Sequence, residues 1–110
     1  MKALDLVQPG EKAVIVYTRG LHFEQHPDGT GSTGNWVISP HRAIDRVIIY
    51  MPEGPTDRRA IFTAEARAII PAGEKKRYRI TLEDVRFVGE TTSTWQEFAG
   101  GGQNPIRYLH

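Results

Sequence analysis

The sequence predicts a mainly β fold of the α+β class, with about five strands in one small mixed sheet and one or two short helices. Apolar, β-branched runs recur along the chain, whereas helical patterns are short. The length of 110 residues fits one domain, and we assign residues 1–110 to it. Many strands in so short a chain favour closure into a small β-barrel, because closure removes exposed strand edges.

Two segments have the pattern of buried central strands. Residues 12–18 and residues 46–51 are continuous runs of apolar, mostly β-branched side chains, the composition of strands covered on both faces. Pro52 ends the second run, since proline cannot donate a hydrogen bond to a neighbouring strand. Residues 103–109 are expected to form an extended closing strand after a glycine-rich tract.

Two further segments alternate along their length, as half-buried strands do. Residues 59–70 alternate in this way and predict a strand; a helix is the alternative, because residues 64–68 have high helix propensity. Residues 78–88 also alternate, and the alternation changes phase near Glu83 and Asp84. That change predicts a β-bulge at these residues.

The remaining elements are short. Ser39 begins a segment, 39–44, with the pattern of a capped helical turn. Thr94 and Glu97 have the spacing of a capping box and predict a second short helix. Residues 19–35 are rich in glycine and lack periodicity, so we predict a long loop, which in a compact domain is usually functional or mobile.

Composition excludes several classes of site. The chain contains no cysteine, which excludes disulfides, thiolate zinc sites and cysteine nucleophiles, and fits the reducing cytoplasm where we expect the protein. No apolar run is long enough to span a membrane, and the first residues lack the apolar core of a signal peptide. The net charge of +1 falls well short of that of a strong general nucleic-acid binder.

Catalytic and metal-binding patterns are weak. His22 and His26 have a spacing that would place both on one face of a helix, but the composition there favours an ordinary polar loop. Three acidic residues alternate with arginines on the predicted strands, which favours cross-strand ion pairs over acid–base catalysis. These residues are Glu65, Glu83 and Asp84. We therefore expect no catalytic residue, no metal ligand and no cofactor.

Two tryptophans stand out because each lies in a run of polar and small residues. Trp36 follows the sequence Gly-Ser-Thr-Gly-Asn, and Trp95 lies among threonines and a serine shortly before a glycine-rich tract. Both positions are junctions between loops and regular elements, where binding pockets are commonly built. We predict that Trp36 and Trp95 wall in a planar heterocycle such as a nucleobase. The alternative is that each tryptophan plugs one end of the barrel.

Asparagine amides carry a donor and an acceptor, which match the edge of a base. Asn35 precedes Trp36, and Asn104 precedes Pro105, which biases Asn104 toward an extended backbone. We predict that Asn35 and Asn104 read the base edge; a turn-stabilising role is the alternative for Asn104. The glycines at 100–102 either let the backbone approach a ligand closely or form a flexible turn.

Basic side chains cluster in two places, each at a turn between predicted strands. The residues are Arg58, Arg59, Lys75, Lys76 and Arg77. We predict that they contact the phosphates that flank the base. Solvated hairpin ends are the alternative interpretation.

A family resemblance rests on the order of these features. A loop that ends in Asn35 and Trp36 precedes a short helical turn, and an aspartate then opens the apolar run 45–50, which ends in Tyr50. This pattern resembles the PUA-like superfamily, in particular its EVE, YTH and ASCH branches, over residues 12–88. The resemblance implies a small β-barrel with a pocket for a flipped, often modified, base, formed by Asn35, Trp36 and Tyr50. The ASCH signature Gly-x-Lys-x-x-Glu-x-Arg is absent, and the aromatic cage of the YTH branch is only partly matched.

We expect a nucleic-acid-binding module that holds one flipped or modified base in an aromatic pocket, with RNA or DNA as its partner. A small-molecule- or protein-binding regulatory domain is one alternative, and a small hydrolase acting on RNA or a nucleotide is another. No membrane partner is expected, and the sequence leaves the oligomeric state open.

Overall fold

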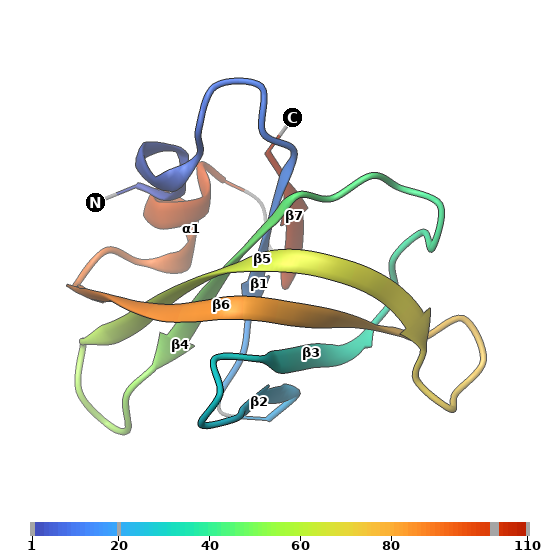
Figure 1. Ribbon diagram of the computed structural model, residues 1–110. Helices are drawn as coiled ribbons and strands as arrows, with labels where there is room; N and C mark the ends of the chain where they lie inside the picture. Colours follow the sequence, from blue (N-terminus) through green and yellow to red (C-terminus); the bar gives the residue numbers. More distant parts are fainter. Residues whose placement is uncertain (1, 20, 102–103, 110) are drawn as a thin grey trace.

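The computed structural model describes residues 2–19, 21–101 and 104–109 (Figure 1). The predicted mainly β fold is confirmed, because the strands form one sheet on which two short helical elements pack. In chain order the elements are the 3₁₀ helix η1 (Ala3–Leu6), β1 (Ala13–Tyr17), β2 (Phe23–Gln25), β3 (Gly31–Trp36), β4 (Arg46–Pro52), β5 (Arg59–Pro71), β6 (Tyr78–Thr91), α1 (Trp95–Ala99) and β7 (Ile106–Tyr108).

The sheet contains seven strands in the order β2-β3-β6-β5-β4-β1-β7. β1 and β4 pair in parallel and the other neighbours pair antiparallel, so the sheet is mixed, as predicted. It is open, because β2 and β7 form its two edges and their described residues do not pair with each other. The predicted closed barrel of about five strands is therefore wrong. Each edge strand has only three residues, which limits the exposed edge without closure.

The long loop predicted for residues 19–35 is also wrong, because β2 and β3 form a hairpin there. Glycine in β3 permits close approach of strands rather than flexibility. A Cβ atom on Gly31 would overlap the carbonyl oxygen of Glu24, and one on Gly34 would lie 2.9 Å from the Cα of Arg79. The composition of this segment therefore reflects tight strand packing.

β5 and β6 are the longest strands, with 13 and 14 residues, and they form a curved hairpin across the molecule (Figure 1). Their pairing shifts register between Thr63 and Glu65, opposite residues 83–86 of β6. Asp84 has a φ of 53° at this irregularity. The predicted bulge is confirmed, and the strand predicted at 59–70, rather than the alternative helix, is confirmed as well.

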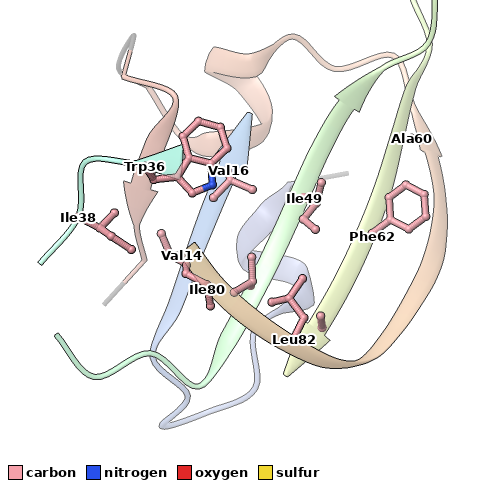
Figure 2. Close-up of a cluster of buried hydrophobic side chains, with 11 residues drawn as sticks. Val14, Val16, Trp36, Ile38, Ile49, Ala60, Phe62, Ile80 and Leu82 are labelled. Atoms are coloured by element: carbon pink, nitrogen blue, oxygen red, sulfur yellow. The ribbon is translucent and has the colours of Figure 1, made fainter. Parts of the chain in front are cut away.

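Both faces of the central strands are buried, because alternate residues of a strand point to opposite faces. One cluster, core A (Figure 2), joins β1 and β3, which are not neighbours in the sheet, so the sheet curls around it. Core A consists of Val14, Val16, Trp36, Ile38, Val47, Ile49, Ala60, Phe62, Ala64, Ile80 and Leu82. The opposite face packs on η1 and α1 to form core B, which consists of Ala3, Ile15, Ile48, Tyr50, Ile61, Trp95, Phe98 and Ala99.

The short helix α1 is fixed at both ends. The Thr94 hydroxyl accepts a hydrogen bond from the Glu97 backbone N–H, and the Thr94 backbone N–H donates to Oε1 of Glu97 at 3.1 Å. The predicted capping box is therefore confirmed. Gly100 ends the helix with a φ of 85°, a conformation that glycine adopts readily. Segment 39–44 contains the predicted capped turn, in which the Ser39 hydroxyl accepts a hydrogen bond from the His41 backbone N–H at 3.4 Å, and the turn does not extend into a helix.

Within the described ranges, no helix combines the length and apolarity needed to cross a bilayer.

Candidate functional site

A pocket lies where β1 and β4 end and α1 begins. Its volume is about 420 Å³, within the range of roughly 300–1,000 Å³ that small-molecule sites occupy. Three aromatic side chains and two arginines line it, and its described lining includes no acidic side chain. We call it the aromatic pocket; it is lined by Tyr17, Arg19, Tyr50, Arg59, Thr94, Trp95, Gln96 and Pro105.

The rings of Tyr17, Tyr50 and Trp95 form one cluster in this pocket. Each pair of ring centroids is 5.4 Å apart, and the two tyrosine rings meet the indole at 84° and 63°. Such edge-on contacts are favourable between aromatic rings. Tyr50 is 1% exposed and Trp95 is 7% exposed, whereas Tyr17 is half-buried. Tyr17 therefore offers more ring surface to a ligand than the other two.

The strand pairing brings these rings together. Tyr17 and Tyr50 are register partners in the parallel pair β1–β4, and Tyr17 is the last residue of β1. The Tyr50 hydroxyl donates to the Ser93 carbonyl at 2.8 Å, which ties β4 to the segment before α1. Trp95 is the first residue of α1. Parallel strands end at the same edge of a sheet, so the two tyrosines meet the indole there.

The pocket carries positive charge beside its rings. The guanidinium of Arg19 lies 5.8 Å from the centroid of the Tyr17 ring, a cation–π distance. Arg59 lies beside the Tyr50 hydroxyl and donates to the Thr56 carbonyl at 3.1 Å. Burial raises the pKa of Tyr50, and Arg59 opposes this shift. Tyr50 therefore remains a neutral hydrogen-bond donor at physiological pH.

The indole N–H of Trp95 is an unused donor. The N–H has no hydrogen-bond acceptor among the described residues, and it is not sealed away from the surface. An indole N–H in a protein interior usually has a partner. The exposed Gln96 follows it in the chain and also lines the pocket, with a side-chain amide that can donate and accept hydrogen bonds.

Trp36 has a different environment. It belongs to core A, and its indole N–H donates to the Thr33 hydroxyl at 3.0 Å. The Thr33 hydroxyl in turn donates to the His22 carbonyl at 2.7 Å. Trp95 belongs to core B on the other face. The structure therefore does not bring the two tryptophans to one pocket.

Asn35 lines a second hollow, the asparagine pocket, of about 280 Å³. Its Oδ1 atom is buried and has no donor among the described residues, an arrangement that costs about 1–3 kcal/mol. Arg77 donates to the Asn35 carbonyl at 3.3 Å. The asparagine pocket is lined by Leu21, His22, Phe23, Glu24, Ser32, Gly34, Asn35 and Arg79.

Asn104 uses its side chain locally. Its Oδ1 accepts a hydrogen bond from the Ile106 backbone N–H at 3.1 Å, which stabilises a turn as in the alternative interpretation. The adjacent Pro105 lines the aromatic pocket. In the predicted glycine turn, residue 102 lies outside the described residues, as do residues 103 and 110.

The two basic clusters lie at opposite ends of β5. Arg59 begins β5 and lines the aromatic pocket, whereas Lys75, Lys76 and Arg77 follow its other end. The strand between them spans roughly 40 Å along its path. Arg58 forms an exposed ion pair with Glu90, with a nitrogen–oxygen distance of 3.7 Å. Arg59 therefore lies at the aromatic pocket, whereas none of the second cluster lines it.

The structure adds Tyr17, Arg19 and Gln96 to the site. The sequence contains one relevant signal: Tyr17 and Tyr50 each follow three β-branched apolar residues, Val-Ile-Val and Val-Ile-Ile. Two such runs paired in parallel and in register place their tyrosines side by side. The pairing itself brings together residues that are distant in the chain, and no local pattern contains it.

Among the described residues, no group of three or more histidine, cysteine, aspartate or glutamate side chains is placed to hold a metal ion. No protein-family model, no curated protein and no solved structure matches the chain.

Proposed function

We propose that the aromatic pocket binds one unstacked nucleobase together with its phosphate, and that the protein is a module for single-stranded RNA or DNA. The observation that carries this proposal is the cluster of Tyr17, Tyr50 and Trp95 flanked by Arg19 and Arg59. Aromatic rings beside cationic groups are the usual means by which proteins hold single strands.

The charge of the pocket favours a nucleotide over a neutral ligand. Arg19 and Arg59 line the pocket, and its described lining has no carboxylate to balance them. A bound phosphate satisfies guanidinium groups with short, charge-assisted hydrogen bonds. A neutral heterocycle of the same size would bring no negative charge to balance the two guanidinium groups.

The polar groups of the pocket supply recognition of the base. Trp95 and Gln96 both line the pocket, so the edge of a bound base has the indole N–H, the amide NH2 group and the amide oxygen as hydrogen-bond partners. Stacking against an aromatic ring contributes about 1–3 kcal/mol per base, and the half-buried Tyr17 ring is the surface for it. The PUA-like resemblance adds the expectation that a modified base is preferred.

Variants with a single tryptophan test the proposal, because the chain has two tryptophans. Trp36→Phe leaves Trp95 as the reporter, and Trp95→Phe leaves Trp36. Titration with nucleoside monophosphates, plain and base-modified, should quench the emission of Trp36→Phe with saturation. The same titration should leave the emission of Trp95→Phe unchanged.

Arg19→Gln separates the phosphate from the base. We expect weaker binding of monophosphates and unchanged binding of the matching nucleosides, with a salt dependence that is less steep by about 0.7 in log–log slope. Arg67→Gln is the control, since Arg67 is exposed, pairs with Glu83 and does not line the aromatic pocket. If nucleosides alone quench the emission, and neither Arg19→Gln nor added salt changes their affinity, the pocket instead binds a neutral small molecule. If no nucleotide quenches the emission, the proposal is wrong.

A further inference from the structure

We propose that the asparagine pocket is a second nucleotide subsite, and that one single strand runs to it from the aromatic pocket. This inference rests on the proposed function of the aromatic pocket. It assigns a role to Asn35 and Arg79, which the aromatic pocket does not use.

A third hollow, the connecting hollow, joins the two pockets. Its volume is about 270 Å³. It shares Tyr17 and Arg19 with the aromatic pocket, and it shares Leu21 and His22 with the asparagine pocket. The three hollows therefore follow one another along the segment after β1. The proposed strand passes from one outer pocket to the other along these shared residues.

The asparagine pocket has the groups that a nucleotide needs. The buried Oδ1 of Asn35 has no donor among the described residues, so an amino or imino group of a base would complete it after rotation of the amide toward the pocket. Arg79 forms no ion pair with the described residues, which leaves its guanidinium to a phosphate. Gly34 lies directly on the Arg79 backbone, where a side chain would occupy space.

The charges along this path also fit a phosphate backbone. Arg59, Arg19 and Arg79 line successive hollows, and Arg77 adjoins Asn35. Among the described lining residues, Glu24 is the single acid, and it lies in the asparagine pocket. A path of aromatic and cationic side chains that is longer than one nucleotide predicts an affinity that rises with strand length.

The first experiment measures affinity against length. Homo-oligonucleotides of one, three and six residues, in both ribo and deoxy forms, are titrated at two salt concentrations against the unchanged protein and against Trp36→Phe, because Trp36 lines the connecting hollow. We expect the trinucleotide to bind about tenfold more tightly than the monophosphate. The ribo and deoxy series identify which nucleic acid is the source of the strand.

The second experiment removes the proposed subsite. In the Trp36→Phe background, Arg79→Gln should abolish most of the gain from one to three nucleotides and reduce the log–log salt slope of the trinucleotide by about 0.7. It should leave binding of the monophosphate unchanged. Asn35→Asp, which keeps the side-chain shape and adds a negative charge, should act in the same direction. Arg86→Gln is the matched control, because Arg86 lies on the same strand, is exposed and pairs with Asp84.

The outcomes separate the two proposals. If monophosphates bind but the trinucleotide gains nothing, or if Arg79→Gln lowers both affinities equally, the second subsite is wrong and the proposed function stands. If neither monophosphates nor oligonucleotides bind, the proposed function fails and the second subsite fails with it. A length gain that Arg79→Gln and Asn35→Asp remove, and that Arg86→Gln preserves, establishes the subsite.

Discussion

Trp36 and Trp95 are equally buried, yet their surroundings differ in kind. Each side chain is 7% exposed. Trp36 lies in core A with its N–H bonded to Thr33, whereas Trp95 lies in core B with its N–H unused among the described residues. Burial alone therefore does not distinguish an indole whose N–H is used within the fold from one whose N–H is open to a ligand. The two tryptophans are distinguished by whether the indole N–H has a hydrogen-bond acceptor among the described residues.

The two sides of the sheet also differ in how they hold their tryptophan. Trp36 ends a strand that pairs with β6, so the sheet itself fixes it. Trp95 sits on a five-residue helix, which is too short to be stable in isolation. Its position depends on the capping box and on packing against core B. Residues of a binding site commonly lie on such weakly held elements.

The largest expected effect is that of Trp36→Ala. Removal of a buried tryptophan destabilises a protein by about 3–5 kcal/mol, and here it also leaves the Thr33 hydroxyl without its donor. Urea unfolding followed by circular dichroism measures the change. Val37→Ala is the control: Val37 is 66% exposed, and its truncation should change stability by less than about 0.5 kcal/mol. A small loss for Trp36→Ala would contradict the structural role of Trp36.

Conservative replacements isolate the hydrogen bond from the volume. Trp36→Phe and Trp95→Phe remove similar volumes, but only the first removes a hydrogen bond of the protein interior. We expect Trp36→Phe to be less stable than Trp95→Phe by about 1 kcal/mol. Equal losses in the same urea experiment would show that the indole N–H groups are equivalent in the folded protein.

Loss of the helix cap should affect the Trp95 side alone. Thr94→Ala removes the hydroxyl that accepts from Glu97 and should cost about 1 kcal/mol of stability. Because α1 carries Trp95 and Gln96, the variant should also bind monophosphates more weakly. Thr92→Ala, at an exposed threonine nearby, is the control for both measurements. Unchanged binding by Thr94→Ala would mean that α1 does not position the pocket.

Most of the fold is predictable from local patterns, and the exceptions have physical causes. β1 and β4 are recognisable because the residues at their centres are apolar, mostly β-branched and buried. β3 is not, since Gly31 and Gly34 are placed for close approach to neighbouring backbone. Closure of the sheet depends on whether its edge strands meet, and no local pattern encodes that.

The candidate site was only partly predictable for a related reason. Tyr50 and Trp95 stand out in the sequence, and the structure places both in the aromatic pocket. Tyr17 completes the cluster only because β1 pairs with β4 in one particular register. Asn35 and Trp36 lie in a run of small and polar residues, as Trp95 does. The curl of the sheet nevertheless places them at other hollows.

The smallest expected effect is a pH dependence at Tyr50. Burial raises its pKa, with Arg59 opposing, so the folded protein holds the hydroxyl proton more tightly than the unfolded chain does. The stability from Tyr50 is therefore complete below its unfolded pKa of about 10. It is lost as the pH rises from there through the raised folded pKa, because the unfolded chain ionises first.

Tyr50→Phe tests this dependence, since phenylalanine cannot ionise. Near neutral pH the variant should be less stable by about 1 kcal/mol, because it lacks the hydrogen bond to the Ser93 carbonyl. That difference should shrink as the pH rises above about 10, while other groups titrate alike in both proteins and cancel. A difference that stays constant over this range would show that Tyr50 ionises as easily in the folded protein as in the unfolded chain.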